Sequence, residues 1–288
     1  MPSEPPLLPI REVTRLTGVN PVTLRAWERR YGLIVPHRTS KGHRLYANEH
    51  VQRIQQILHW LNRGVAVGQV KPLLDSPPPV ADSAPDDDWH ALRLRLIECL
   101  EQLAERRLDQ LINQVMALYP ATTLCEQLFL PLLNQLDTRW HGHPAARMER
   151  VFFHSWLRSK LGGRVYHNNR QLSGAPALLL NGSNLPFDAQ LWLCAWLLSD
   201  SGRAVEVFDW PIPARELAFA VEGLSADAVL VSLNAAADSA ELQSGLALIG
   251  GPKLVFGSAV SLYGKALASH DLTLFDSPLS AARHLLSS

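Results

Sequence analysis

Residues 20–46 read NPVTLRAWERRYGLIVPHRTSKGHRLY, and their local signals determine the structure of the N-terminal region. Asn20 is a typical N-cap residue, and Pro21 suits the first position of a helix because its missing N–H is not needed there. A short helix is therefore predicted to begin at Pro21. Gly32 is expected to end it, since glycine is common just past the last helical residue.

A small β-hairpin is predicted after this helix. Two short apolar or aromatic runs, residues 33–35 and 45–46, lie on either side of residues 39–42, whose composition is typical of a turn. The helix and the hairpin together contain one acid, Glu28, and six basic residues: Arg25, Arg29, Arg30, Arg38, Lys41 and Arg44. A basic helix followed by a basic hairpin predicts a winged helix-turn-helix, in which the helix enters the major groove of DNA and the wing contacts the flanking backbone.

The same stretch resembles the DNA-binding domain of the MerR family, whose members carry T-L-R-x-W/Y-E in the helix and P-x-R and G-x-R-x-Y in the wing. These motifs match residues 23–28, 36–38 and 42–46. The stretch resembles the CarH/MlrA-like branch of the family. It implies a sequence-specific transcription regulator that binds an inverted repeat in double-stranded promoter DNA as a homodimer and works with RNA polymerase.

Ten side chains are the candidates for DNA contact. In the helix, Thr23, Arg25 and Trp27 are expected to meet the major groove, by base edge or by phosphate. The remaining seven are expected to position the DNA backbone or to place the wing on the minor groove and phosphates: Arg30, Tyr31 and Arg38 for the backbone, and Lys41, His43, Arg44 and Tyr46 for the wing.

Charge divides the 288 residues into unlike parts. Residues 9–74, the predicted DNA-binding domain, hold 11 Lys and Arg against 3 Asp and Glu, so they carry +8 and the remaining chain carries −8. This balance fits binding to nucleic acid by one end only. Residues 75–88 form a Pro- and Asp-rich linker without coiled-coil heptads, so dimerisation is expected further along the chain.

The rest of the chain changes from a helical to an alternating pattern. Residues 89–170 repeat apolar side chains at three- and four-residue steps, which predicts a four-helix bundle. Residues 174–288 alternate apolar strands with helical stretches, which predicts an α/β domain with a doubly wound parallel sheet of flavodoxin type. The predicted fold class is therefore multi-domain: an all-α winged helix-turn-helix, a bundle and a flavodoxin-like domain.

This domain order resembles that of the cobalamin-dependent regulators, so the last two domains are cobalamin-binding-like. Their sheet domain carries E/D-x-H-x-x-G, in which the His coordinates cobalt and the Gly lets the corrin approach. Here Asp188 is present, but Gln190 and Leu193 replace the His and the Gly. An amide is a poor cobalt ligand, and a leucine side chain occupies the space that glycine leaves open.

The bundle motif of those regulators, W-x-x-G followed by an E-H pair, is also altered. Trp140 and Gly142 are one residue too close together, and Glu149 is followed by Arg150 instead of His. The resemblance therefore predicts that cobalamin binding is lost and that no cofactor is bound. A dimerisation or sensory role, or contact with a protein partner, is expected of these domains.

Two alternatives stay open beside this interpretation. One is a working cobalamin-dependent light-sensing repressor of CarH type. The other is a corrinoid carrier or mutase-like enzyme domain that has acquired a DNA-binding arm. A visible absorption spectrum would distinguish these alternatives from the interpretation without a cofactor, because a bound corrinoid is coloured.

No other class of site is predicted. No cysteine or acidic cluster closely joins His141, His143 and His154, so ordinary solvated histidines are expected and no metal site. The cysteines, Cys99, Cys125 and Cys194, are dispersed and contain no CxxC. The sequence lacks the motifs of a nucleophile elbow, a metalloprotease or a phosphate-binding loop, so it is not expected to be an enzyme. It also lacks a long apolar run and a signal-peptide pattern, which predicts a cytoplasmic protein without a membrane segment.

Overall fold

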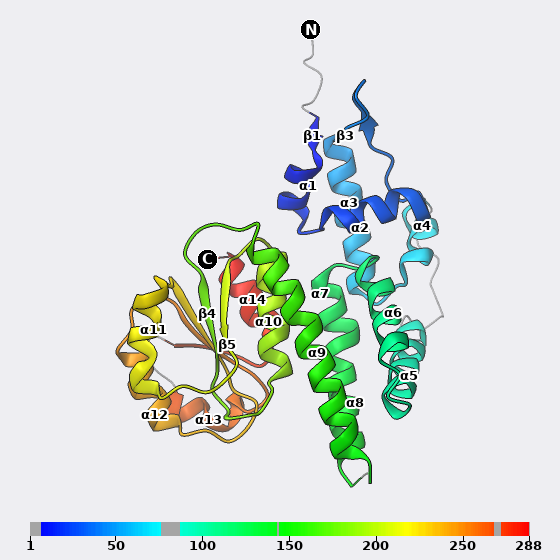
Figure 1. The fold of residues 1–288 in the computed structure, drawn as a ribbon. Helices are drawn as coiled ribbons and strands as arrows, with labels where there is room; N and C mark the ends of the chain where they lie inside the picture. Colours follow the sequence, from blue (N-terminus) through cyan, green and yellow to red (C-terminus); the bar gives the residue numbers. More distant parts are fainter. Residues whose placement is uncertain (1–6, 76–86, 143, 268–271, 288) are drawn as a thin grey trace. The chain divides into compact units, whose positions relative to one another are not determined.

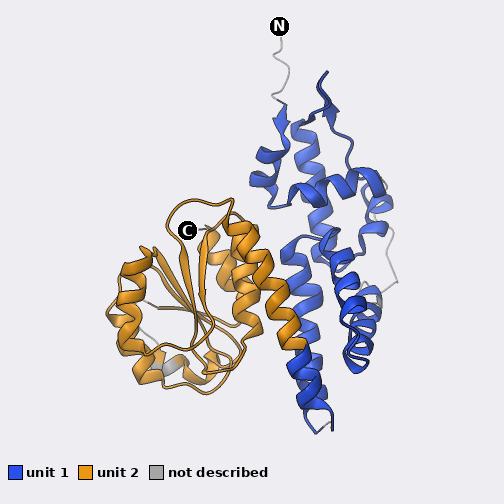
Figure 2. Ribbon diagram, viewed as in Figure 1, with its two compact units in different colours: residues 1–152 blue, residues 153–288 orange. Residues whose placement is uncertain are grey.

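The computed structural model describes residues 7–75, 87–142, 144–267 and 272–287. The chain divides into two compact units, residues 1–152 and residues 153–288, which Figure 2 colours separately. The division differs from the predicted domain boundaries, because helix α9 (Ala146–Asn169) begins in the first unit and ends in the second. The predicted linker at residues 75–88 lies almost wholly outside the described residues.

The first part of unit 1 combines short strands with helices. In chain order these are β1 (Leu8–Pro9), α1 (Ile10–Thr17), α2 (Pro21–Ala26), the wide helical turn η1 (Trp27–Tyr31), β2 (His37–Arg38), β3 (Arg44–Tyr46), α3 (Asn48–Asn62) and α4 (Val67–Asp75). The predicted start of α2 is confirmed, since the Asn20 side chain accepts a hydrogen bond from the Thr23 N–H at 2.9 Å. The predicted end is confirmed as well, because Gly32 closes η1 at a φ of 57°.

The hairpin forms with a different first arm. Strand β2 pairs antiparallel with β3, and β1 pairs with the other edge of β3. The prediction that residues 33–35 form the first arm was wrong, because strand pairing starts only at His37. Leu33 and Ile34 are instead fully buried in the core of unit 1. The apolar character of Leu33 and Ile34 is therefore explained by packing in the core, and it does not indicate a strand.

The second part of unit 1 consists of helices that share a core with the first part. They are α5 (Asp87–Glu101), α6 (Glu105–Met116), α7 (Ala121–Leu124), η2 (Cys125–Phe129), α8 (Leu130–Trp140) and the start of α9. The Trp89 Nε1–H donates to the Gly64 carbonyl at 3.0 Å, and the Val67 N–H donates to the Tyr119 hydroxyl at 3.1 Å. The two rings lie 4.7 Å apart and are buried, so these contacts hold α4 and its preceding turn against α5 and α6.

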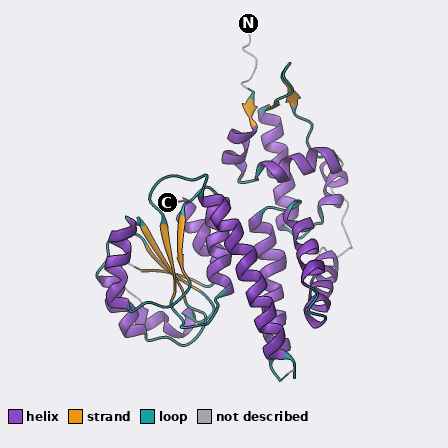
Figure 3. Ribbon diagram, viewed as in Figure 1, coloured by secondary structure: helices purple, strands orange, loops and turns teal. Residues whose placement is uncertain are grey.

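Unit 2 contains the predicted parallel sheet, which is confirmed. All its neighbouring strands are parallel, in the order β5-β4-β6-β7-β8, which is the flavodoxin-type order (Figure 3). Its strands are β4 (Ala177–Asn181), β5 (Val205–Phe208), β6 (Ala228–Ser232), β7 (Lys253–Phe256) and β8 (Leu272–Phe275). The three inner strands are buried along their whole length, because helices cover both faces of the sheet.

The helices of unit 2 lie in two layers. In Figure 1, α10 and α14 cover one face of the sheet, and α11, α12 and α13 cover the other. Their bounds are α10 (Ala189–Asp200), the 3₁₀ turn η3 (Ala214–Glu216), α11 (Leu217–Leu224), α12 (Ser239–Ala247), α13 (Val260–Leu267) and α14 (Pro278–Ser287). The later part of α9 packs beside α10, and Asn169 bonds the backbone of Val205 on β5. Within the described residues, no helix combines the length and the apolar character that a membrane crossing requires.

Two helical glycines of unit 2 are expected to respond oppositely to alanine. A Cβ at Gly163 in α9 meets open space, whereas a Cβ at Gly245 in α12 would lie 2.4 Å from the Ala214 carbonyl oxygen. Gly163→Ala should raise the free energy of unfolding by about 0.5–1 kcal/mol, through helix propensity alone. Gly245→Ala should lower it by about 1–3 kcal/mol, because α12 must move away from η3. Urea unfolding of both variants measures the difference, and equal effects would contradict this packing.

The end of α10 makes the stability of unit 2 depend on pH. Burial raises the pKa of Asp200 from 3.8 to about 6, although the positive charge of Arg164 acts in the opposite direction. Because the pKa in the folded state is the higher one, folding takes up a proton between pH 4 and pH 6. At higher pH the carboxylate is ionised in the folded state, and this lowers the free energy of unfolding by up to about 3 kcal/mol.

Asp200→Asn should therefore raise the free energy of unfolding at pH 8 and leave it unchanged near pH 3.5. Urea unfolding of the variant and of the wild-type chain from pH 3.5 to 8 measures this difference. Curves that stay parallel over the whole range would show that Asp200 carries no such penalty.

Candidate nucleic-acid interface

Helix α2 and η1 form one continuous helical segment with two unlike sides. The residues between the Asn20 cap and Gly32 keep right-handed helical geometry through Trp27, where α2 passes into η1. One side is exposed, and we call it the outer face: Val22, Arg25, Arg29 and Arg30. The spacing of residues 22, 25 and 29 is that of neighbours on one helix surface. The outer face therefore presents three guanidinium groups and one apolar side chain.

The other side of the segment is anchored inside unit 1 by Trp27. The indole is fully buried, and its Nε1–H donates to the Leu118 carbonyl at 2.8 Å. Thr23 is fully buried as well, and its hydroxyl has no hydrogen-bond partner within the described residues. The expectation that Thr23 and Trp27 meet the major groove is corrected, since neither side chain reaches the surface of unit 1.

Glu28 connects the helical segment to the hairpin. Its carboxylate accepts from Arg38 Nη2 at 2.7 Å and from Arg44 Nε at 2.5 Å. Partial burial acts to raise the pKa of Glu28, but the hydrogen bonds from Arg44 and Arg38 outweigh it, so the pKa is lowered. The acid therefore stays ionised and neutralises charge on the two strands of the hairpin.

These ion pairs change the roles expected of two hairpin residues. Arg44 is largely buried and holds β3 against η1, so its guanidinium is already bound within the protein. Tyr46 is buried too, and this burial raises the pKa of its phenol. The expectation that Arg44 and Tyr46 lie on DNA is therefore corrected: both fix the hairpin to the rest of unit 1.

The turn of the hairpin keeps its basic side chains free of the core. Gly42 adopts a φ of 82°, and its N–H donates to the Thr39 carbonyl at 2.8 Å, which closes the turn. Lys41 and His43 on either side are exposed, as is about half of the Arg38 side chain. The structure thus places Arg38, Lys41 and His43 at the surface, in the hairpin that follows η1 along the chain.

The two remaining predicted residues lie at the end of the helical segment. Arg30 is exposed as part of the outer face, whereas Tyr31 is partly buried beside Gly68 of α4. The sequence analysis missed two members of the outer face, Val22 and Arg29. Their helical spacing from Arg25 is the signal that could have identified them, once Leu24 and Trp27 were assigned to the core.

A group of possible metal ligands lies beside the hairpin, outside the set that the sequence predicted. Single ligand atoms of His37, Glu49 and His50 lie within 4.8 Å of one another. The His50 Nδ1, however, accepts a hydrogen bond from the Ala47 N–H at 2.9 Å. A neutral imidazole with this bond carries its proton on Nε2, so metal binding at Nε2 would break the cap of α3.

The histidines that the sequence analysis considered do not form a described cluster. His141 lies in unit 1, where its Nδ1 is 2.5 Å from the Asp137 carbonyl oxygen. His154 lies in unit 2, where its ring contacts Phe187 with 4.9 Å between the ring centres. His143 lies outside the described residues.

In unit 2, the carboxyl edge of the sheet is occupied by a network of short polar side chains. Asp188 is buried; its Oδ1 accepts from the Leu191 N–H, and both its oxygens lie 3.0 Å from Asn234 Nδ2. Burial raises the pKa of Asp188, while these hydrogen bonds act in the opposite direction. Asn234 also bonds Ser232 and accepts from the Ser258 N–H, so it links three loops.

The other altered corrin positions are also packed. Leu193 is fully buried, and the Gln190 side-chain oxygen is buried without a hydrogen-bond partner in the described residues. In unit 1, the buried Glu149 carboxylate accepts from Arg139 at 3.1 Å and from Trp140 Nε1 at 3.2 Å. Arg150 lies over the Trp140 ring, 5.0 Å from its centre. The two residues of unit 2 do not fit a corrinoid: Gln190 offers an amide where an imidazole would bind cobalt, and Leu193 fills the glycine position.

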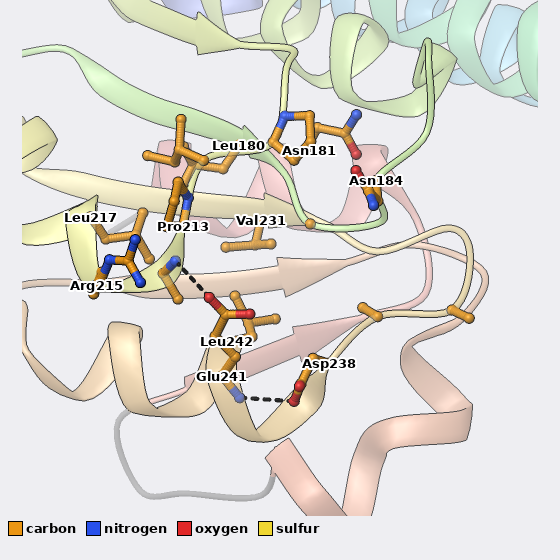
Figure 4. A pocket seen from close by; sticks show the side chains of 16 residues that line it. Leu180, Asn181, Asn184, Pro213, Arg215, Leu217, Val231, Asp238, Glu241 and Leu242 are labelled. Carbon is orange, nitrogen blue, oxygen red and sulfur yellow. Dashed lines mark hydrogen bonds between the residues drawn. The ribbon is translucent and has the colours of Figure 1, made fainter.

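A separate cleft of about 670 Å³ lies at the same edge of the sheet, between the ends of β4 and β6 and the start of α12 (Figure 4). The two acidic side chains that line it, Asp238 and Glu241, both accept hydrogen bonds from backbone N–H groups. Asp238 caps α12 by accepting from the Ala240 and Glu241 N–H groups, and Glu241 accepts from the Ala214 N–H at 3.4 Å. Arg215 and Asn184 also line the cleft. The two acids therefore stabilise the starts of η3 and α12.

Known proteins resemble both the N-terminal part and the longer chain. The model of the MerR HTH family regulatory proteins matches residues 8–77. The HTH-type transcriptional regulator MlrA of Salmonella typhimurium is 34% identical over 201 residues, which cover 70% of this chain and 79% of that protein. The HTH-type transcriptional repressor CarH of Myxococcus xanthus is 26% identical and covers 91% of this chain and 90% of its own.

A solved structure, the methanol:cobalamin methyltransferase complex MtaBC from Methanosarcina barkeri, covers 75% of this chain and 88% of its own at 11% identity and a TM-score of 0.36. A likeness at this level carries no argument about the function of the chain. The relationship to MlrA, together with the matched N-terminal family model, is much more specific. The chain therefore belongs to the MerR family of helix-turn-helix regulators, in its CarH/MlrA-like branch, and is a DNA-binding transcription regulator.

Proposed function

We propose that the regulator places the outer face of α2 and η1 in the major groove of promoter DNA. The observation that carries this proposal is the division of the helical segment: Arg25, Arg29 and Arg30 are exposed while Trp27 is buried on the opposite side. Exposed guanidinium groups bind phosphates and the guanine edge. Glu28 is the one acid of the segment, and its charge is offset by Arg38 and Arg44. The outer face is thus strongly positive.

The hairpin of β2 and β3 is the proposed wing. Lys41 and His43 stand exposed at its turn, and Arg38 keeps about half of its side chain exposed while it bonds Glu28. These groups suit sequence-independent contacts with the backbone that flanks the major groove. Because Arg44 and Glu28 fix the hairpin to η1, the wing and the outer face would meet DNA as one rigid surface.

We propose that the protein acts as a homodimer on an inverted repeat, with RNA polymerase as its partner at the promoter. Two copies of one helix bind two half-sites in successive turns of the groove, and linkage raises their joint affinity. Residues 75–88 carry no heptad pattern, which favours dimerisation through the helices and the sheet domain beyond them. Because the partner is DNA, we propose that the regulator is located in the cytoplasm. Two chains per duplex by native mass spectrometry would support this assembly, and one chain per duplex would refute it.

We further propose that the sheet domain binds no corrinoid and serves dimerisation or contact with another protein, without enzymatic activity. Gln190, the buried Leu193 and the Glu149–Arg139–Trp140 network support this proposal, because each occupies a position that a corrinoid-binding relative would need. The alternatives of a cobalamin light sensor and of a corrinoid carrier both require corrinoid-binding residues at these positions. Neither is favoured by the contacts of Asp188, which is bound to Asn234.

Substitutions on the two sides of the helical segment should have different effects on DNA binding. Arg25→Ala and Arg29→Ala should each weaken binding and lower the slope of log affinity against log salt by about one unit, since each removes a contact with DNA. If Arg25 also contacts a base, its loss should cost about 1–3 kcal/mol at one position of each half-site. Arg147→Ala, which removes an exposed arginine of α9, is the matched control and should leave the slope unchanged.

Trp27→Phe should affect stability instead. Loss of the indole N–H leaves the Leu118 carbonyl without its donor, so the free energy of unfolding should fall by about 1–3 kcal/mol. The salt slope of DNA binding should stay at the wild-type value. Fluorescence anisotropy from 50 to 300 mM salt and urea unfolding measure these two quantities. A lowered slope in Trp27→Phe, or an unchanged slope in both arginine variants, would contradict the proposed orientation.

Adenosylcobalamin should not bind to the purified chain. Protein mixed with adenosylcobalamin in the dark and passed over a gel-filtration column should elute without corrinoid absorbance, because the cobalt position carries Gln190 and the glycine position carries Leu193. Gln190→His alone should not restore binding, since Leu193 still occupies the corrin position. Co-elution near one equivalent per chain, abolished by Gln190→Ala, would overturn the proposal.

A further inference from the structure

Val22 is the apolar member of an otherwise basic outer face. It lies in the first turn of α2, where 58% of its side chain is exposed, and Arg25 follows three residues later on the same surface. Single exposed apolar residues are common on proteins. The position of this one is specific, because Thr23 and Leu24 beside it are buried and the other members of the outer face are charged.

Neither folding nor helix propensity accounts for a valine at this position. A β-branched side chain loses rotamer freedom in a helix, so valine is a weaker helix former than the common surface residues. Its exposed methyl groups also gain little of the stabilisation that burial in the core would give. An apolar partner outside the chain would give these methyl groups the burial that folding does not.

The major groove offers one apolar group, the C5-methyl of thymine. Residues in the first turn of a recognition helix are those that approach the base edges. Arg25, one turn further along, has the chemistry to bind a neighbouring guanine or a phosphate. Resting on the proposed placement of α2 in the major groove, we infer that Val22 packs against a thymine methyl in each half-site and thereby determines part of the sequence specificity.

The inferred contact predicts different affinities for duplexes whose bases differ by one methyl group. Thymine and deoxyuracil have the same hydrogen-bonding edge, so exchange of one for the other removes only the contact with Val22. A buried methyl-sized group contributes enough to change affinity by roughly fourfold. 5-Methylcytosine carries its methyl at the same place in the groove, so it should restore part of the affinity that cytosine loses at this position.

The experiment uses the full-length chain and a random duplex library to select bound sequences. Each thymine of the selected duplex is then replaced singly by deoxyuracil, and the affinities are measured. For the wild-type protein, one thymine per half-site should show a roughly fourfold loss. Val22→Ala should lose about the square of this factor on the unmodified duplex, roughly sixteenfold, because both half-sites lose the contact. It should also bind the thymine and deoxyuracil duplexes equally.

Val151→Ala is the matched control, because Val151 of α9 is 59% exposed and lies outside the DNA-facing segment. It should keep the wild-type sensitivity to deoxyuracil. Val22→Ala should fold normally, since its side chain is mostly in solvent. If no sequence is selected from the library, the proposed function itself fails. If sequences are selected but no thymine is sensitive, or Val22→Ala keeps the wild-type sensitivity, DNA binding stands and the contact with the methyl group is refuted.

Discussion

The hydrogen bond from Trp27 to the Leu118 carbonyl determines which side of the helical segment faces the solvent. A buried indole N–H requires an acceptor, and the turn between α6 and α7 supplies it. With Trp27 fixed inward, helical geometry places Arg25 and Arg29 outward. The helices that follow the N-terminal part are therefore more than a separate domain: they contribute an acceptor that orients α2 and η1. Trp89 and Tyr119 strengthen the same packing through Gly64 and Val67.

Glu28 adds the second constraint, because it joins η1 to both strands of the hairpin. A largely buried carboxylate that lost Arg44 would be left without its closest partner, so the ion pair holds the hairpin in one position. The exposed charges at the hairpin turn then have a fixed relation to the outer face. In unit 2, Asp188 and Asn234 have a comparable role, since they tie the loops after β4, β6 and β7 into one packed edge.

Local signals in the sequence predicted the start of α2, the end of η1, the turn of the hairpin and the parallel sheet. Asn20, Pro21 and Gly32 act through bonds to near neighbours, so their effects do not depend on the rest of the fold. The alternation of apolar strands and helices likewise predicted the sheet, because strands covered on both faces must be apolar throughout. The roles of Thr23, Trp27, Arg44 and Tyr46 could not be predicted in this way. Trp27 finds its partner 91 residues away, and Arg44 finds Glu28 16 residues away. The members of the outer face could be identified only once these partners were known.

Protection of the outer face by bound DNA is the most direct test of this account. The three native cysteines are buried, so maleimide should report on an introduced thiol. Arg29→Cys and, as a reference, Arg147→Cys would be labelled in the full-length chain with and without saturating selected duplex. The account predicts that DNA slows labelling at position 29 severalfold and leaves position 147 unchanged. Equal labelling rates at position 29 with and without DNA would show that the outer face does not meet the duplex.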